Sequence, residues 1–426
     1  MDRIACVILG GGKGERLYPL TKDRAKPAVP FGCRYRLVDI PISNSIHAEI
    51  KEIFIVTQFN SDSLHTHISS TYHFDSFTRG FVRIMAAKQS FRAETGWFLG
   101  TADAVRKNLP SFLASNPEHF MILSGDQLYR MNLKKFLKEH VESKAEISIA
   151  ATPVNRKTAG SLGILKLDEE GFIDSFIEKP GDEKDISEYK MPEKFIEDSK
   201  KSDRKEYLAS MGIYIFNTKT MLQSLDSEFS DFGKELIPDA INKYKVKGYV
   251  YKGYWEDIGT IRSFYEANLN LASISPYFNL YDEMKPIYGR RTDLPPSKIN
   301  ACTFRNALAG EGSIITDAFI SNSLIGIRTI IDSGASLENV YCMGADFYET
   351  DEQRIENRSQ GIPNIGIGAG TIIGNAIVDK NVRIGRNCRI GIDNIERKDG
   401  TYDNYHIRDG LIIINKNACL KDGTSI

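Results

Sequence analysis

Apolar and polar positions alternate with two different periods along the first 275 residues of this chain. Short apolar runs predict β-strands, and apolar residues every three or four positions predict helices. The predicted strands are Ile4–Leu9, Ile53–Thr57, Phe120–Leu123, Ile147–Thr152, Gly212–Phe216 and Tyr249–Tyr251, and the predicted helices are Ala102–Leu109, Leu133–Ser143, Thr218–Leu225 and Ile261–Ala272. Strands that alternate with helices favour an α/β domain with a mostly parallel sheet, helices on both faces, and ligands at the carboxyl ends of the strands.

The alternation stops at a proline-rich stretch between residues 276 and 296. Pro276, Pro286, Pro295 and Pro296 interrupt it, and the Pro295-Pro296 pair should be extended and free of helix. We therefore predict a first domain over residues 1–275, a linker over 276–296 and a second domain over 297–426.

A six-residue apolar period marks the second domain. The two series are Phe319, Ile325, Ile331, Leu337 and Ile372, Val378, Ile384, Ile390, with glycine directly after several members. This period predicts a parallel β-helix, in which one apolar residue per face points inward and the coils stack on one another. A β-sandwich with chance spacing is the alternative. Residues 341–363 break the period and should project as a loop or a short helix.

Composition and charge argue against several classes of function. The chain has 55 basic and 56 acidic residues, a net charge of −1, which argues against a general nucleic-acid or acidic-membrane binder. It lacks an apolar run near the roughly 20 residues that span a bilayer. Because the first predicted strand begins almost at once, we expect no signal or transit peptide in this sequence. The six scattered cysteines predict reduced thiols and a cytoplasmic location, or a plastid stroma if a transit peptide has been removed. His65 and His67 are spaced poorly for a metal pair and are expected at the surface.

The first predicted strand ends in a glycine cluster with basic residues. Gly10, Gly11, Gly12 and Gly14 let backbone N–H groups turn toward one anion, and Arg16 adds a guanidinium suited to phosphate oxygens. The spacing fits neither a P-loop nor a dinucleotide fingerprint. A plain tight turn would use the same glycines. The residues after the loop are therefore needed to distinguish a phosphate-binding loop from such a turn.

Two acidic residues follow predicted strands. Asp126 lies in Ser124-Gly125-Asp126, and Asp257 lies in a Trp-Glu-Asp-Ile-Gly string. Mg²⁺ prefers a few carboxylates together with phosphate oxygens and waters, so the pair is a candidate metal site, although each could be a helix cap or turn residue. Lys179 precedes a proline, which holds it extended and could aim its ammonium at an anion; a plain surface lysine is the alternative.

Longer strings strengthen these assignments. Gly10–Leu17 followed by Leu17–Thr21 and Arg24–Pro30 resembles the sugar-phosphate nucleotidyltransferases. Further strings resemble the glucose-1-phosphate adenylyltransferases, nearer the cyanobacterial and plant type than the enteric type: Trp97–Val105, Ala209–Tyr214, Asp231–Gly233, Tyr254–Thr260, Met343–Asp351 and Asp379–Gly385. The resemblance implies a Rossmann-like catalytic domain and a left-handed β-helix for oligomerisation and regulation. It also implies Mg²⁺-dependent conversion of ATP and α-D-glucose 1-phosphate to ADP-glucose and diphosphate, the committed step of glycogen or starch synthesis.

The resemblance also implies residue roles. The implied catalytic residues are Arg16, Lys26, Asp126, Lys179 and Asp257, with Asp126 and Asp257 as metal ligands. The implied ATP contacts are Leu9, Gly10, Gly11, Gly12, Gly14, Arg16, Lys26, Gln89, Phe98, Gly100 and Thr101. The implied glucose 1-phosphate contacts are Gly163, Glu178, Lys179, Ser210 and Asp257, and the implied allosteric residues are Arg24, Trp97 and Lys416.

The chain departs from the family pattern at Gln127, where a histidine is common, and at Leu162, where phenylalanine is common. By resemblance we expect a homotetramer, a metabolite activator such as 3-phosphoglycerate, and inhibition by AMP or phosphate. Three alternatives stay open: a UTP- or dTTP-dependent sugar nucleotidylyltransferase, a β-helix acyltransferase, and a non-catalytic regulatory subunit. The acyltransferase is disfavoured because His406 is the only histidine after residue 300.

Overall fold

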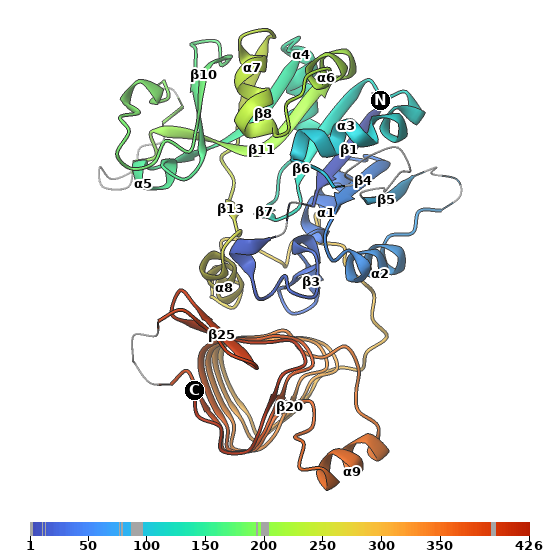
Figure 1. Ribbon diagram of the computed structural model, residues 1–426, viewed down its shortest axis with the longest axis vertical. Coiled ribbons are helices and arrows are strands. Elements are labelled where there is room, and N and C mark those ends of the chain that lie inside the picture. Colours follow the sequence, from blue (N-terminus) through green and yellow to red (C-terminus); the bar gives the residue numbers. More distant parts are fainter. Residues whose placement is uncertain are drawn as a thin grey trace. The chain divides into compact units, whose positions relative to one another are not determined.

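The computed structural model describes residues 3–10, 12, 14–75, 77, 80–86, 97–192, 195–196, 204–392 and 398–426. The chain forms two compact units (Figure 1). Unit 1 comprises Met1–Gly12, Ile40–Ser61 and Ile68–Glu256, and unit 2 comprises Lys13–Asp39, Asp62–His67 and Asp257–Ile426.

The amino-terminal part alternates strands and helices as expected. Its strands are β1 (Ile4–Leu9), β4 (Glu52–Thr57), β5 (Phe81–Ala86), β6 (His119–Ser124), β7 (Gln127–Tyr129), β8 (Ile147–Val154), β9 (Gly163–Leu167), β10 (Ile173–Glu178), β11 (Tyr207–Asn217), β12 (Val246–Val250) and β13 (Trp255–Asp257). Its helices are α1 (Asp39–His47), α2 (Asp62–Thr71), α3 (Thr101–Phe112), α4 (Leu133–Glu142), α5 (Arg156–Ala159), α6 (Thr218–Leu225), the π-helical η7 (Phe232–Leu236), α7 (Ile237–Ile241) and α8 (Ile261–Asn270). All ten predicted elements exist, with ends shifted by a few residues.

One nine-stranded sheet organises unit 1. Its order is β10-β9-β11-β6-β1-β4-β5, and β8 joins β11 to β12. Strand β1 lies between β4 and β6 and is parallel to both, so that Leu9 pairs with Val56 and Ser124. Strand β11 is antiparallel to β6, β8 and β9. The α/β class is confirmed, and the carboxyl ends of β1 and β6 meet at one edge.

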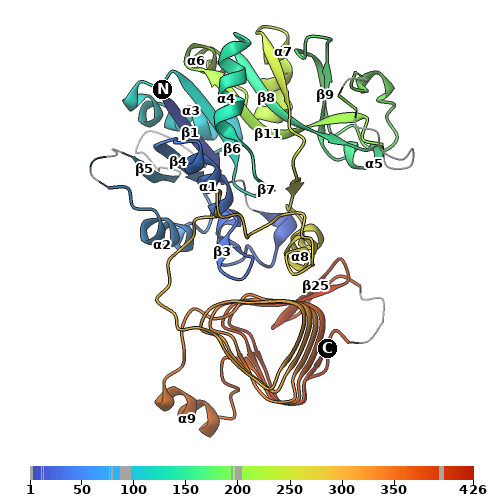
Figure 2. The same ribbon diagram turned by 180° about the vertical axis from the view of Figure 1, so that it is seen from behind.

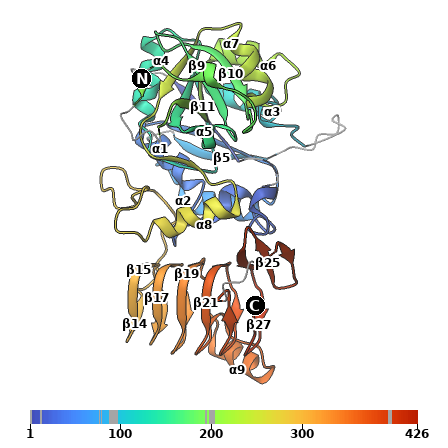
Figure 3. The same cartoon turned by 90° about the vertical axis from the view of Figure 1, so that its left-hand side faces the viewer.

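Helices cover both faces of this sheet because β1 is apolar on both. Helices α3, α6 and α7 lie on one face, and α1 and α4 lie on the other (Figure 3). Ala5 and Val7 enter the core that includes Val105 of α3. Cys6, on the opposite face, contacts the hydroxyl of Ser45 in α1. A continuous apolar run is what a strand buried on both faces requires.

The carboxy-terminal part consists of stacked coils. Before it, unit 2 contains η1 (Glu15–Leu17), η2 (Lys26–Ala28), β2 (Pro30–Phe31) and β3 (Tyr35–Arg36). The coil strands are β14 (Lys298–Asn300), β15 (Thr303–Ala309), β16 (Ile314–Thr316), β17 (Phe319–Ile325), β18 (Ile330–Ile331), β19 (Ser336–Cys342), β20 (Gly366–Ile367), β21 (Ile372–Val378), β22 (Arg383–Ile384), β23 (Arg389–Ile390), β24 (Gly400–Thr401), β25 (Tyr405–Arg408), β26 (Leu411–Ile414) and β27 (Cys419–Leu420). Coil strands pair in parallel, as in β17 with β19, while β24, β25 and β26 pair antiparallel. The prediction of parallel coils is confirmed (Figure 2).

Asparagine forms one corner of the coils. Asn322, Asn339 and Asn375 lie in the middle of β17, β19 and β21 with positive φ, a conformation that asparagine adopts more readily than most residues. Their side chains form a ladder: Asn322 donates to Asn339 at 2.6 Å, and Asn339 donates to Asn375 at 3.2 Å. Each strand therefore turns from one face of the coil to the next at its asparagine.

The predicted inward positions were right for six of the eight residues. Ile325, Ile331, Leu337, Val378, Ile384 and Ile390 are in the coil core. Phe319 and Ile372 are not, because the paired register places Ile320 and Ile373 in line with Leu337. In these two strands the turn at the asparagine moves the inward-facing position by one residue, to Ile320 and Ile373. A strict count of six residues does not detect this shift.

Two interruptions of the regular pattern that the sequence predicted are present in the structure. Between α8 and β14, residues 271–297, all of them described, contain no helix or strand. The break in the coil period contains α9 (Asp351–Ser359), which begins with a capping box between Thr350 and Gln353. Glu349 anchors this excursion: its carboxylate lies 2.6 Å from Arg383 and accepts a bond from the Ile365 backbone at 2.8 Å.

Other expectations can also be compared with the structure. All six cysteines are free thiols. None of the helices among the described residues is long and apolar enough to cross a membrane. His65 is exposed as expected, but the surface prediction for His67 was wrong. Its side chain is 2 % exposed because Nε2 lies 2.6 Å from Oδ1 of the buried Asp39.

Substituting Gly344 tests the coil packing. This glycine has a φ of 84°, and an added β-carbon would lie 2.1 Å from the Ile327 carbonyl oxygen. We expect Gly344→Ala to lower the free energy of unfolding by about 1–3 kcal/mol or more, since both strain and overlap act there. Gly361→Ala is the matched control, because Gly361 also has positive φ but open space around its Cα. Equal losses of thermal stability in the two variants would refute the overlap.

Candidate functional site

The first strand delivers the glycine loop to the same edge as Asp126. The Gly10 N–H donates to Val56 O at 2.7 Å, and the Gly125 N–H donates to Leu9 O at 3.0 Å. Asp126 follows directly and accepts a short hydrogen bond from the Ser124 hydroxyl. The glycine loop and this carboxylate therefore lie at adjacent carboxyl strand ends, where open sheets bind ligands.

A second group gathers around Glu178. Strands β9 and β10 pair Gly163 with Glu178, and a β-carbon on Gly163 would lie 2.7 Å from Glu178 Oε2. Lys179 is exposed and places Nζ 3.2 Å from Glu178. The prediction that Pro180 holds it extended was wrong, because its φ is 44°, in the left-handed region. Gly233 is near the same carboxylate, at 3.6 Å from its added β-carbon. The predicted sugar-side residues Gly163, Glu178 and Lys179 are thus neighbours.

The start of α3 is fixed against η7. Thr101 Oγ1 donates to Asp231 Oδ2 at 3.1 Å and accepts from the Phe232 N–H at 3.0 Å. An added β-carbon on Gly100 would lie 2.4 Å from Ser230 O, so the close approach requires glycine. Phe98 donates its N–H to Gln58 Oε1 at 2.5 Å. Asp231 belongs to a string that carries the family resemblance, but the sequence gave it no role, and Gln58 is a supporting residue that the sequence did not single out.

Ser210 lies beside a bulge in β11. The register of β11 against β8 shifts between Ser210 and Ile213, and the Ser210 hydroxyl accepts from the Gly212 N–H at 3.3 Å. Burial raises the pKa of Tyr214, the Ser210 hydrogen bond lowers it, and the net shift is upward. Gln127, the departure from the family pattern, is buried and accepts from the Trp255 indole at 3.1 Å.

Unit 2 holds a compact set of charged candidates. Gly14, with φ of 69°, precedes η1, which carries Arg16. A β-carbon on Gly259 would lie 2.9 Å from Arg16 Nη2, 3.0 Å from Asp257 Oδ1 and 3.2 Å from Lys26 Nζ. Lys26 is 7 % exposed, whereas the Arg16 side chain is 66 % exposed and 3.9 Å from Asp257. Two cations and one carboxylate therefore converge on one glycine.

Two of the regulatory candidates, Arg24 and Lys416, lie in or near another charged cluster of unit 2. The two terminal nitrogens of the Arg24 guanidinium, Nη1 and Nη2, each donate to one carboxylate oxygen of Asp379 at 2.9 Å, and both side chains are 4 % exposed. Burial is the largest single cause and lowers the pKa of Arg24, but the carboxylates of Asp379, Asp346 and Asp23 together outweigh it, and the net shift is upward. Asp346 lies 2.5 Å from the Lys380 ammonium. Although burial raises the pKa of Asp346, Lys380 and, more weakly, Lys416 lower it, so Lys416 is close to this cluster.

Other candidates lie elsewhere. Trp97 belongs to unit 1, is 49 % exposed and stacks on Phe59 at 4.9 Å between ring centroids. Gly11 and Gln89 lie outside the described residues, and Gly12 is exposed. The candidates divide between the units: Asp126 belongs to unit 1 and Asp257 to unit 2. Within the described residues, no three His, Cys, Asp or Glu side chains form a metal-binding group.

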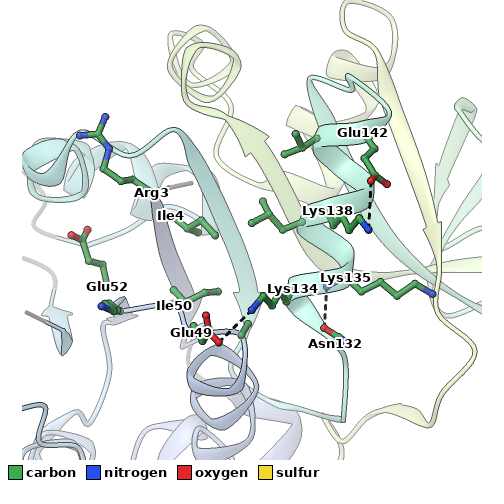
Figure 4. Close-up of a pocket in the computed structure, with 14 residues that line it drawn as sticks. Arg3, Ile4, Glu49, Ile50, Glu52, Asn132, Lys134, Lys135, Lys138 and Glu142 are labelled. Carbon is green, nitrogen blue, oxygen red and sulfur yellow. Dashed lines mark hydrogen bonds and ion pairs between the residues drawn. The ribbon is translucent and has the colours of Figure 1, made fainter. Parts of the chain in front are cut away.

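A groove of about 850 Å³ in unit 1 contains none of these candidates (Figure 4). It lies at the amino ends of β1 and β4, which begin at Ile4 and Glu52, beside α4. This is the sheet edge opposite to the one that binds ligands in such folds. Four of its cations are in ion pairs, for example Lys134 with Glu49 at 3.3 Å. The groove therefore is not the site that the sequence predicts.

Comparison with known families accounts for most of the chain. Residues 5–274 match the family described as nucleotidyl transferase, which is more than half of the 426 residues. Residues 292–425 match the GLGC left-handed parallel β-helix domain. The second match confirms the hand predicted for the coils.

Proposed function

Because the chain belongs to the nucleotidyl transferase family and ends in a GLGC β-helix, the architecture of glucose-1-phosphate adenylyltransferase, we propose that it transfers the adenylyl group of ATP to α-D-glucose 1-phosphate. The products are ADP-glucose and diphosphate. Arg16, Lys26 and Asp257 around Gly259 carry the proposal, because phosphate chemistry needs converging cations beside a carboxylate that can hold a metal.

The reaction joins two polyanions, so the protein must mainly position them and neutralise charge. Arg16 and the buried Lys26 hold the β- and γ-phosphates through charge-assisted hydrogen bonds, supported by N–H groups of the glycine loop. A general base is unnecessary, because the attacking sugar phosphate oxygen is already ionised. The oxygen donors of Asp126 and Asp257 fit Mg²⁺, which when bound would neutralise charge on the reacting phosphates.

The remaining proposed contacts orient the substrates. Lys179 holds the phosphate of glucose 1-phosphate, while Glu178, Ser210 and Gly163 contact the sugar. On the nucleotide side, Leu9, Gly10, Gly11, Gly12 and Gly14 form the loop, and Gln89, Phe98, Gly100 and Thr101 contact the rest of ATP. The intact charged residues favour a catalytic chain over a regulatory subunit.

Several properties of the family come with this proposal. The product feeds α-glucan synthesis, the location is cytoplasmic, and the protein is a homotetramer. The domain limits 1–275 and 297–426, and the likeness to the cyanobacterial and plant type, stay predictions. Arg24, Trp97 and Lys416 take part in control by central-carbon metabolites, with AMP or phosphate as inhibitor. Activation by 3-phosphoglycerate at subsaturating substrate tests the regulatory part, which an unchanged rate would refute.

Turnover with a panel of nucleotides tests the substrate assignment. We expect diphosphate release with ATP and glucose 1-phosphate to exceed that with UTP or dTTP by at least about tenfold in kcat/KM. Removing Mg²⁺ with a chelator should abolish turnover, and adding Mg²⁺ back should restore it. A clear preference for UTP or dTTP would assign the chain to another sugar nucleotidylyltransferase.

A further inference from the structure

A second cavity lies beside η1, within unit 2. Its volume is about 700 Å³, within the range of small-molecule sites. Its cationic lining residues are Arg16 on η1, Lys22 in the following turn, and Arg408 at the end of β25. The acidic lining residues are Glu15 and Asp409. Three cations against two acids leave a net charge of +1, so the cavity suits an anion.

The hairpin that β25 forms with β26 packs against the turn after η1, within unit 2. The Tyr18 ring meets the ring of His406, in β25, edge-on at 5.2 Å. Arg262 of α8 donates a short hydrogen bond to the Asp409 carbonyl oxygen. The hairpin therefore has contacts on both sides of Arg408, one with the turn after η1 and one with α8.

Arg408 is held in one orientation before any ligand binds. Its Nη1 donates to Gly400 O at 2.8 Å and to Ile407 O at 2.7 Å, and its Nη2 donates to Thr401 Oγ1 at 2.9 Å. These bonds occupy three of the five N–H donors of a guanidinium. The other two have no partner within the described part of the chain and remain for a ligand.

Burial is the largest cause that lowers the pKa of His406, and two cations that line this cavity, Arg408 and Lys22, both lower it further. Both cations are therefore near the same imidazole, although they lie almost 400 positions apart in sequence. Such a cluster of like charges is stabilised when a multivalent anion binds.

We propose that this cavity receives the diphosphate that leaves ATP, and that Arg408 of the β-helix is a binding residue for it. The inference rests on the proposed function, in which Arg16 holds the β- and γ-phosphates. During transfer, the sugar phosphate oxygen forms a bond to the α-phosphorus and the bond to the bridging oxygen breaks. The electron pair of that bond stays on diphosphate. Arg16 of η1 and Arg408 of β25, which both line the cavity, neutralise the added negative charge.

The reverse reaction, from ADP-glucose and diphosphate to ATP and glucose 1-phosphate, isolates this site. We expect Arg408→Gln to raise the KM for diphosphate about tenfold, as loss of a charge-assisted hydrogen bond predicts. The KM for ADP-glucose should stay within about twofold. Arg408→Lys keeps the charge and should recover part of the affinity. Arg389→Gln, at an exposed arginine of β23, is the control and should leave both KM values unchanged.

Two results would overturn the inference. One is an unchanged KM for diphosphate in a stably folded Arg408→Gln protein. The other is a changed response to a phosphorylated metabolite with an unchanged KM for diphosphate, which would make the cavity a regulatory anion site. If Arg408→Gln unfolds the hairpin, Lys22→Gln takes its place, with the same expected rise and the same refuting result. Failure of the wild-type protein to transfer nucleotide would instead refute the proposed function itself.

Discussion

Lys26→Met is expected to lower the kcat for ADP-glucose formation by about 100- to 1000-fold, the usual cost of losing one preorganised donor to a developing negative charge. Lys26 is 7 % exposed, and its ammonium approaches Gly259 together with Arg16 and Asp257. Methionine fills a similar volume without charge, so the fold should survive. Steady-state kinetics and a thermal melt on the same preparation check both points.

The control for this variant is Lys298→Met, at an exposed lysine of β14. It removes the same charge from the same unit and should leave kcat unchanged. Lys26→Arg should recover only part of the rate, because a guanidinium does not replace a compact ammonium in a tight site. A wild-type kcat in a folded Lys26→Met protein would remove Lys26 from the catalytic set.

Asp379→Ala is expected to lower the free energy of unfolding of unit 2 by about 3–5 kcal/mol, because it leaves the Arg24 guanidinium buried without its partner. The pair joins the turn before Lys26 to the coil after β21. Replacing both partners, as in Arg24→Met with Asp379→Leu, should recover most of the loss. Chemical denaturation measures each variant.

An exposed pair in the same unit supplies the comparison. Arg34 and Glu311 lie 2.8 Å apart but are 36 % and 40 % exposed. Glu311→Gln should cost at most about 1 kcal/mol, since exposed ion pairs contribute little. Equal losses of stability in Asp379→Ala and Glu311→Gln would refute the claim that burial makes the loss of the Arg24 partner costly.

The sequence predicted elements that depend on local pattern. The apolar run of β1, the glycines after it and the acidic residue after β6 could be placed because a parallel sheet brings carboxyl strand ends to one edge. The coils were recognisable because each repeats a six-residue apolar period. Even there, the inward phase failed at Phe319 and Ile372, where the asparagine corners set the register.

Contacts between distant segments could not be predicted. Arg24 and Asp379 are 355 positions apart. The sequence around each residue contains no pattern that predicts their contact. His67 looked like a surface residue because only the fold places it against Asp39. Gln127 appeared as a departure from a pattern, whereas the structure shows the amide bonded to Trp255. Arg408 had no signal until the β25 hairpin was seen beside η1.

The central claim is that this chain moves a nucleotidyl group, not a terminal phosphoryl group. A single-turnover reaction with ATP labelled at the α-phosphorus, Mg²⁺ and glucose 1-phosphate tests it most directly. Nucleotidyl transfer predicts that all transferred label appears in ADP-glucose and that the diphosphate released is unlabelled. Label recovered in free ADP, with a second phosphate on the sugar, would contradict the account.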